Sequence, residues 1–211
     1  MPRSNPFDSV DSRPSEGAVG SRFVLYVEGP SDCHILRTWA GLVSRDLARR
    51  LSRNSVILGG RRPARAVEHF LGLRTPAAGA TGSLRGICVL DRDGRAGDVA
   101  AEKPDGLEFF TWPRRHIESY LLVPSAMRRC MRMASQDLRV GELIGDLPRN
   151  GSEEVLRNLD AKRLLADKSA QAREFGALLS PARIAGCMNR SDLHGDVLAL
   201  LERLKTVAAD H

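Results

Sequence analysis

Short, unbroken runs of apolar residues recur along the first half of the chain and predict β-strands. The runs cover residues 23–27, 55–58, 86–90 and 107–111. They are rich in Val, Ile, Leu and Phe, and polar residues do not alternate with them. This pattern is typical of strands that are buried on both faces, as in a parallel sheet. We therefore expect a four-stranded, mostly parallel sheet.

Apolar residues recur at helical spacing between these runs and after them. Residues 35–47 and 61–73 show this spacing between the strands, and residues 127–133, 154–166 and 193–204 show it after the last strand. Strands that alternate with helices predict an α/β fold. Because only helices are indicated after the last strand, we expect the sheet to be flanked by helices and followed by a helical C-terminal extension.

The composition divides the 211 residues into three parts. Residues 1–20 contain three prolines with several serines and glycines, which indicates a flexible leader. Residues 21–124 carry the strand pattern and form the predicted sheet domain, and residues 125–211 form the predicted helical extension. At ~150 residues per domain, this length predicts one domain with a subdomain or tail.

The charge of the chain favours a polyanionic partner but has a second explanation. Basic residues outnumber acidic residues by 32 to 26, which gives a formal charge of +6. Such an excess favours nucleic acid as a partner. However, 28 of the basic residues are arginines, and a GC-rich genome produces the same skew. The functional and the compositional explanations both stand.

The cysteines and the apolar segments predict the cellular setting. The cysteines are far apart and form no Cys-x-x-Cys pair, so they indicate free thiols in a reducing cytoplasm rather than a zinc site. The first residues lack the apolar region of a signal peptide, and the apolar runs are too short to span a membrane. We expect a soluble cytoplasmic protein that has no membrane partner.

Acidic residues follow two of the predicted strands. Glu28 and Asp32 follow the first strand, and Asp91 and Asp93 follow the third. Ligands of open α/β sheets bind at the carboxyl ends of the strands, where crowded carboxylates are relieved by a hard cation such as Mg²⁺ or Mn²⁺. Asp32 also has a structural explanation, because it or Ser31 can cap the following helix, and Asp93 can belong to a turn. Together, the acids favour a metal site.

Four segments resemble parts of a known family. Residues 27–32 (Val-Glu-Gly-Pro-Ser-Asp) are similar to the first motif of TOPRIM domains, and residues 89–94 (Val-Leu-Asp-Arg-Asp-Gly) are similar to their Asp-x-Asp motif. Residues 112–122, which include Ile-Glu-Ser-Tyr-Leu-Leu, resemble the segment that follows the TOPRIM core in OLD-family (overcoming lysogenization defect) nucleases. Residues 160–165 resemble a lysine-containing helix of that group. The resemblance implies a TOPRIM-like, Rossmann-like fold over about residues 22–205.

The resemblance also implies an activity. It implies a metal-dependent endonuclease that hydrolyses phosphodiester bonds in DNA or RNA with one or two magnesium ions, and by analogy a role in phage defence. Lys162 would neutralise charge in the transition state, although Lys168 competes for that assignment. Alternatively, Lys162 is a solvated lysine on a helix and Glu118 is an exposed helix residue, and neither then has a role in catalysis or metal binding. The implied metal ligands are Glu28, Asp32, Asp91, Asp93 and Glu118, and the implied catalytic residues are Glu28, Asp91, Asp93 and Lys162.

Two pairs of arginines are candidates for binding nucleic acid. Arg61 and Arg62 follow the second predicted strand, and Arg114 and Arg115 follow the fourth. A guanidinium group can bind a phosphate through two hydrogen bonds. We expect these pairs to contact phosphates that flank the cleaved one. The histidines lack ligand spacing to one another and are interpreted as non-catalytic.

The chain departs from the OLD family in lacking an ATPase motif. OLD-family proteins usually carry an ATPase domain, whereas this sequence contains no GxxxxGK[ST] motif. The nuclease would then act alone or with a separate ATPase partner. The alternatives are a non-catalytic nucleic-acid-binding module and a nucleotidyl-transferring enzyme, although no sequence feature marks a nucleotide pocket. The sequence does not set the oligomeric state, and a homodimer is one option.

Overall fold

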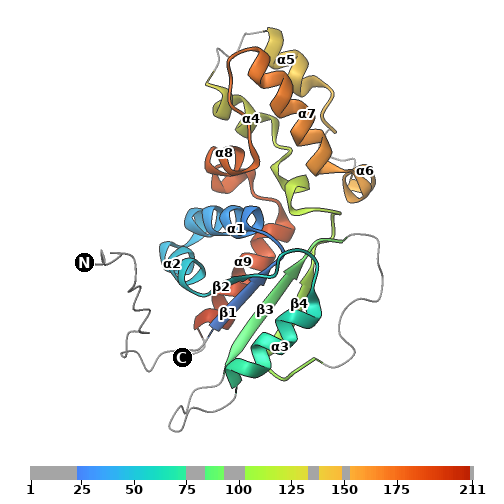
Figure 1. Ribbon diagram of the computed structural model, residues 1–211. Coiled ribbons are helices and arrows are strands. Elements are labelled where there is room, and N and C mark those ends of the chain that lie inside the picture. The colour runs from blue at the N-terminus through green and yellow to red at the C-terminus, as the bar shows by residue number, and fades with distance from the viewer. Residues whose placement is uncertain (1–22, 75–83, 93–102, 133–137, 149–152, 210–211) are drawn as a thin grey trace, which may run out of the picture.

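The computed structural model shows a sheet with helices on both sides and a helical part beyond one edge (Figure 1). It describes residues 23–74, 84–92, 103–132, 138–148 and 153–209. The predicted leader and Asp93 lie outside the described residues. In the part of the chain that is described, no helix is long and apolar enough to cross a membrane. The four cysteines are free thiols.

The sheet consists of four parallel strands in the order β2-β1-β3-β4. The strands are β1 (Phe23–Val27), β2 (Ser55–Ile57), β3 (Arg85–Leu90) and β4 (Leu107–Thr111). The predicted strands and the parallel sheet are therefore confirmed. Because the strands run in one direction, their carboxyl ends share one edge. The acids that follow the neighbouring strands β1 and β3 meet at that edge.

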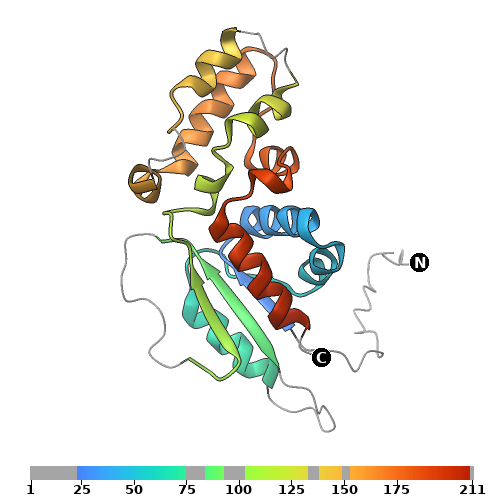
Figure 2. The same cartoon turned by 180° about the vertical axis from the view of Figure 1, so that it is seen from behind.

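Helices cover both faces of the sheet, as Figures 1 and 2 show. These helices are α1 (Pro30–Val43), α2 (Arg45–Arg53), α3 (Pro63–Arg74) and α9 (Gly195–Ala209). Leu25 of β1 packs in one apolar core with α1, α2 and α9, whereas the next residue, Tyr26, packs with α3 on the opposite face. Side chains of a strand alternate between faces, so burial on both faces explains the unbroken apolar runs.

A helical part lies beyond the carboxyl edge of the sheet (Figure 1). Its elements are α4 (Pro124–Met131), α5 (Leu138–Gly145), α6 (Glu153–Asn158), α7 (Ala161–Glu174), α8 (Pro181–Gly186) and the short 3-10 helices η1 (Ile117–Leu121) and η2 (Arg190–Asp192). α8 packs against α1, and Trp39 Nε1 donates to Met188 Sδ at 3.2 Å. α9 then returns to the sheet, and the boundary between residues 124 and 125 stays a prediction.

Capping residues break two of the predicted helices. The predicted helix 154–166 is divided into α6 and α7, because the Asp160 side chain accepts a hydrogen bond from the first turn of α7. The predicted helix 35–47 is divided at Ser44, whose hydroxyl caps α2 in the same way. Such caps satisfy backbone N–H groups that have no partner within the helix. The break at Asp160 places Lys162 in the first turn of α7.

The start of α1 also differs from the prediction. Its cap is Gly29 in an extended conformation, and Pro30 is the first helical residue. The predicted cap at Ser31 or Asp32 is therefore wrong. Asp32 lies in the first turn instead, where its Oδ2 accepts a hydrogen bond of 2.6 Å from the Gly29 N–H. Proline suits this position because its missing N–H would have no helical partner there.

Candidate functional site

Buried carboxylates from separate segments meet at the carboxyl edge of the sheet. Glu28 follows β1, Asp32 lies in the first turn of α1, Asp91 follows β3 and Glu118 lies in η1. All are at most 9% exposed. A hydrogen bond joins Glu28 and Asp91. The charges of Asp32, Asp91 and Glu118 act on one another. We call these residues the acid cluster: Glu28, Asp32, Asp91 and Glu118.

Asp91 connects the elements that form the acid cluster. Its Oδ1 accepts a hydrogen bond of 3.0 Å from the Ile117 N–H of η1, and its Oδ2 accepts one of 2.7 Å from Lys162 Nζ of α7. Its own N–H donates to Glu28 Oε1 at 2.8 Å. Its carbonyl oxygen accepts a hydrogen bond from Arg61. The position of Asp91 is therefore fixed from several sides.

Asp32 combines a structural contact with membership of the acid cluster. Its carboxylate bonds to the backbone at the start of α1, as described above. Burial, together with the nearby charge of Asp91, raises the pKa of Asp32 to about 6. The helix-start contact and the metal-site hypothesis are therefore compatible, because the same carboxylate serves the turn and faces Asp91.

Glu118 contributes to the acid cluster a buried carboxylate oxygen without a hydrogen-bond partner in the described part of the chain. The residue is 5% exposed, and its Oε2 has no hydrogen-bond partner among the described residues. Burial raises the pKa of Glu118 to about 7, and the charges of Asp91 and Asp32 add to this effect, while Lys162 opposes it. A buried carboxylate oxygen without a partner is costly. This atom fits a site that receives a cation.

Lys162, and not Lys168, reaches the acid cluster. Its ammonium group lies 2.7 Å from Asp91 Oδ2, while its side chain stays 48% exposed. Burial by itself lowers the pKa of Lys162, but the hydrogen bond to Asp91 and the surrounding carboxylates raise it above its usual value. Lys168 is buried elsewhere on α7 and donates to Asp146 at 2.7 Å. The structure thus distinguishes two lysines that the sequence motif leaves as competitors.

The arginines after β2 lie beside the acid cluster. Arg61 donates to the Asp91 carbonyl, and its NH1 lies 3.9 Å from Glu28 Oε1. Arg62 is exposed and directly precedes α3. Arg61, Arg62 and Arg65 line a cavity of about 560 Å³ next to this edge. The predicted contacts of Arg61 and Arg62 with phosphate stay a prediction.

The two arginines after β4 differ from each other. Arg114 is 7% exposed, and its guanidinium donates to both carboxylate oxygens of Glu153, at 3.0 and 2.8 Å. It also donates to the Ser119 carbonyl oxygen at 3.0 Å. These contacts support a structural role for Arg114 and not the predicted contact with phosphate. Arg115 is half-buried, and its charge acts on the buried His116 beside the acid cluster.

Three solved structures that are similar to this chain come from one protein. Similar solved structures are the C-terminal region of the OLD protein of Xanthomonas campestris pv. campestris, phased with iodine, platinum and mercury. Each is 16% identical in sequence and covers 90% of this chain, and the matches span 98%, 96% and 98% of those chains with TM-scores of 0.49, 0.46 and 0.46. No family model and no curated protein matches.

The chain is similar in fold to the C-terminal region of an OLD protein. The sequence motifs described above resemble the OLD family. At such low identity the likeness concerns the path of the chain, and it assigns no activity, metal or substrate.

A second polar cluster lies near η1. The sequence analysis did not predict it. Ligand atoms of Glu153, His194 and Asp196 lie within 4.8 Å of one another, a spacing that a metal ion can bridge. However, Arg114 already binds Glu153, and the Tyr120 hydroxyl donates to Asp196 Oδ2 at 2.7 Å. The cluster therefore has internal partners. Glu153 is too far from His194 and Asp196 in the sequence for a spacing motif to reveal the cluster.

Replacing Glu118 by glutamine is expected to stabilise the metal-free protein at alkaline pH. The folded-state pKa of Glu118 is raised to about 7. Its contribution to the free energy of unfolding is therefore complete below the unfolded-state pKa, where the side chain is protonated in both states, and is lost as the pH rises through about 7. Glutamine carries no such titration. At about pH 8 the variant should therefore gain on the order of 3 kcal/mol in free energy of unfolding, and little at about pH 4.

Denaturant unfolding in EDTA across this pH range measures the effect. Glu174→Gln, which changes an exposed glutamate at the end of α7, is the matched control and should show no such trend. A difference between Glu118→Gln and the wild type that does not change with pH would contradict the assignment.

Replacing Arg114 by methionine is expected to destabilise the fold. The change removes two hydrogen bonds to Glu153 and leaves the Ser119 carbonyl without its donor. It also removes the guanidinium that lies 4.6 Å from the centre of the Tyr120 ring. We expect a loss of about 2–4 kcal/mol in free energy of unfolding. Arg115→Met is the control and should change stability by ~0.5 kcal/mol or less. Unchanged stability with weakened binding of nucleic acid would instead identify Arg114 as a phosphate contact.

Proposed function

We propose that this chain is a metal-dependent phosphodiesterase that cleaves DNA or RNA at the acid cluster. The observation that carries the proposal is the buried Oε2 of Glu118, which lacks a partner among the described residues and faces the charges of Asp91, Asp32 and Lys162. Carboxylates that meet at the carboxyl edge of a parallel sheet occupy the usual ligand position of such folds. The sequence motifs that resemble TOPRIM domains point to the same residues.

The residues of the acid cluster fit a divalent cation. They offer hard oxygen donors, which suit Mg²⁺ or Mn²⁺. Burial, and to a smaller degree the charges of the neighbouring carboxylates, raises the pKa values of Asp32 and Glu118, and a bound cation would relieve both costs. We propose Glu28, Asp32, Asp91 and Glu118 as ligands, with Asp93 from the motif. One or two bound ions would activate water and stabilise negative charge on the phosphate.

The surrounding residues position the site and neutralise charge. Glu28 holds the Asp91 backbone through its Oε1, and Ile117 fixes the Asp91 carboxylate. Lys162 is half-exposed, so its ammonium can contact both Asp91 and a phosphate oxygen. Arg61 and Arg62, which follow β2 beside the acid cluster, would contact the phosphates of a bound strand. A preorganised cation beside the cleaved phosphate stabilises the charge of the transition state.

A cleavage assay tests the proposal. The purified chain is incubated with labelled DNA and RNA, single- and double-stranded, in Mg²⁺, in Mn²⁺ and in EDTA. We expect shortened products with either metal and none in EDTA. Binding of metal and nucleic acid without cleavage, even in Mn²⁺, would overturn the enzymatic proposal. It would favour a binding module, or a subunit that acts with a separate ATPase partner. A role in phage defence is proposed from the family resemblance alone.

A further inference from the structure

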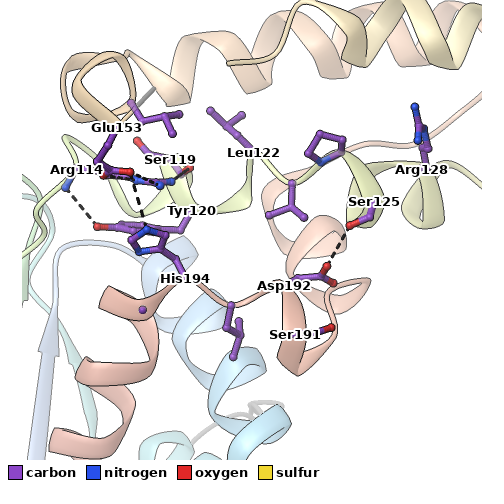
Figure 3. A pocket seen from close by; sticks show the side chains of 15 residues that line it. Arg114, Ser119, Tyr120, Leu122, Ser125, Arg128, Glu153, Ser191, Asp192 and His194 are labelled. Atoms are coloured by element: carbon purple, nitrogen blue, oxygen red, sulfur yellow. Dashed lines mark hydrogen bonds and ion pairs between the residues drawn. The ribbon is translucent and has the colours of Figure 1, made fainter. Parts of the chain in front are cut away.

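A cavity adjoins η1, the short helix that carries Glu118 of the acid cluster. It has a volume of about 700 Å³ and is enclosed by residues 119–128, by α6 and by the turn before α9 (Figure 3). Cavities that hold small ligands have volumes of about 300–1,000 Å³. Glu118 belongs to the acid cluster and the next residue, Ser119, lines this cavity. The two features are therefore neighbours.

The cavity has two different polar ends and an apolar middle. Figure 3 shows Arg114, Glu153 and His194 together at one end, and Ser125 and Arg128 at the other. Leucines and a proline form the wall between them. The Glu153 carboxylate accepts hydrogen bonds, and the His194 imidazole can donate one. A ligand that fits would carry polar edges at one end, a flat apolar body and a negative group at the other.

Arg128 provides a cation without a protein partner. It is exposed, and within the described residues no hydrogen bond or ion pair engages its guanidinium. The neighbouring Arg129, by contrast, donates to Asp192 and to the Cys187 carbonyl oxygen. Ser125 and Ser191 line the same end of the cavity together with Asp192. The Oδ1 of Asp192 accepts a hydrogen bond of 3.0 Å from the Ser125 hydroxyl, and the charge of Asp192 is paired with Arg129. A free guanidinium beside hydroxyl groups is suited to a phosphate group.

Ser119 adds a second, independent sign of a ligand. The residue is fully buried, and its Oγ has no hydrogen-bond partner in the described part of the chain. Its backbone oxygen, in contrast, is bonded to Arg114. A buried hydroxyl without a partner costs free energy, which a ligand or an ordered water in the adjoining cavity would recover.

We propose that this cavity binds a single nucleotide. Its phosphate would contact Arg128 and the serines, its base would pack against the apolar wall, and the base edge would face Glu153 and His194. Carboxylates accept hydrogen bonds from the exocyclic amines of bases. The nucleotide can come from a single strand that also reaches the acid cluster, or from a free mononucleotide. Only the first source rests on the proposed nuclease function.

Binding measured in EDTA tests the proposal without requiring cleavage. AMP, GMP, CMP and UMP are titrated by calorimetry, and a fluorescein-labelled single-stranded oligonucleotide by anisotropy. Arg128→Glu should weaken binding about tenfold or more, because it replaces a charge-assisted contact by repulsion. Arg49→Glu has the same charge change on the exposed face of α2 and is the control. Ser191→Trp, at an exposed position, should block the cavity independently.

The outcomes separate the source of the nucleotide from the existence of the site. Displacement of the labelled strand by a mononucleotide supports a shared cavity, and mononucleotide binding without displacement supports a free nucleotide. Binding is measured in EDTA, where no metal-dependent cleavage occurs, so failure of cleavage does not affect this result. No binding of either probe, or equal binding by Arg128→Glu and Arg49→Glu, would overturn the proposal.

Discussion

Replacing Asp91 by asparagine is expected to reduce cleavage by about 10³-fold, because loss of a central ligand forfeits several kcal/mol of metal-assisted stabilisation of the transition state. Asparagine keeps the shape of the side chain and one oxygen for the Ile117 N–H. It removes the negative charge that Lys162 contacts at 2.7 Å. The measurement is the rate of product formation at saturating Mg²⁺.

The control for this variant is Asp167→Asn, an exposed change on α7. It should cleave at the wild-type rate. Thermal unfolding in EDTA should show that Asp91→Asn is folded, because removal of one carboxylate relieves repulsion within the acid cluster. Cleavage by a folded Asp91→Asn at a rate near that of the wild type would place the catalytic centre elsewhere.

Replacing Lys162 by methionine is expected to reduce cleavage about 10²-fold while metal affinity is kept or increased. The loss reflects removal of a positive group beside the transition state, for which single donors contribute about 10²–10³-fold. Metal affinity should not fall, because the ammonium and a cation compete for the Asp91 Oδ2 atom. This opposite movement of rate and affinity distinguishes a catalytic lysine from a structural one.

Lys205→Met is the matched control, because Lys205 is exposed on α9. Its cleavage rate and metal affinity should match those of the wild type. If Lys162→Met also matches the wild type in both, Lys162 is a solvated helix residue and the proposed role is wrong.

The strands could be predicted because burial on both faces leaves a direct signal. β1 packs into one core through Leu25 and into another through Tyr26, and the sequence shows both as one apolar run. Helix ends left a weaker signal. Asp160 and Ser44 each cap a helix. The helical spacing of apolar residues continues across both caps, so this spacing alone predicts one helix where the structure has two.

The acid cluster was partly predictable, for a topological reason. Glu28 and Asp91 follow strands that are neighbours in the sheet, and a parallel sheet brings such positions together. Glu118 came from the family resemblance, since its own segment forms a short 3-10 helix with no strand signal. The choice between Lys162 and Lys168 required the path of α7. Local spacing does not contain that information.

Arg114 shows why charged residues are difficult to interpret from sequence. Its position after β4 suits a phosphate contact, and a pair with Arg115 looks like an exposed basic patch. The structure instead buries it against Glu153, which is 39 positions away. A long-range partner of this kind supports a structural role for a candidate binding residue, and no local sequence pattern indicates it.

Calorimetric titration with Mg²⁺ and Mn²⁺ tests the central claim most directly, because the claim is that the acid cluster holds a divalent cation. The titration is performed above the raised pKa of Glu118, which is about 7, with the wild type and with an Asp91→Ala, Asp93→Ala double variant. We expect saturable binding by the wild type that is lost in the folded variant. Absence of binding by the wild type, or equal binding by both proteins, would contradict the account.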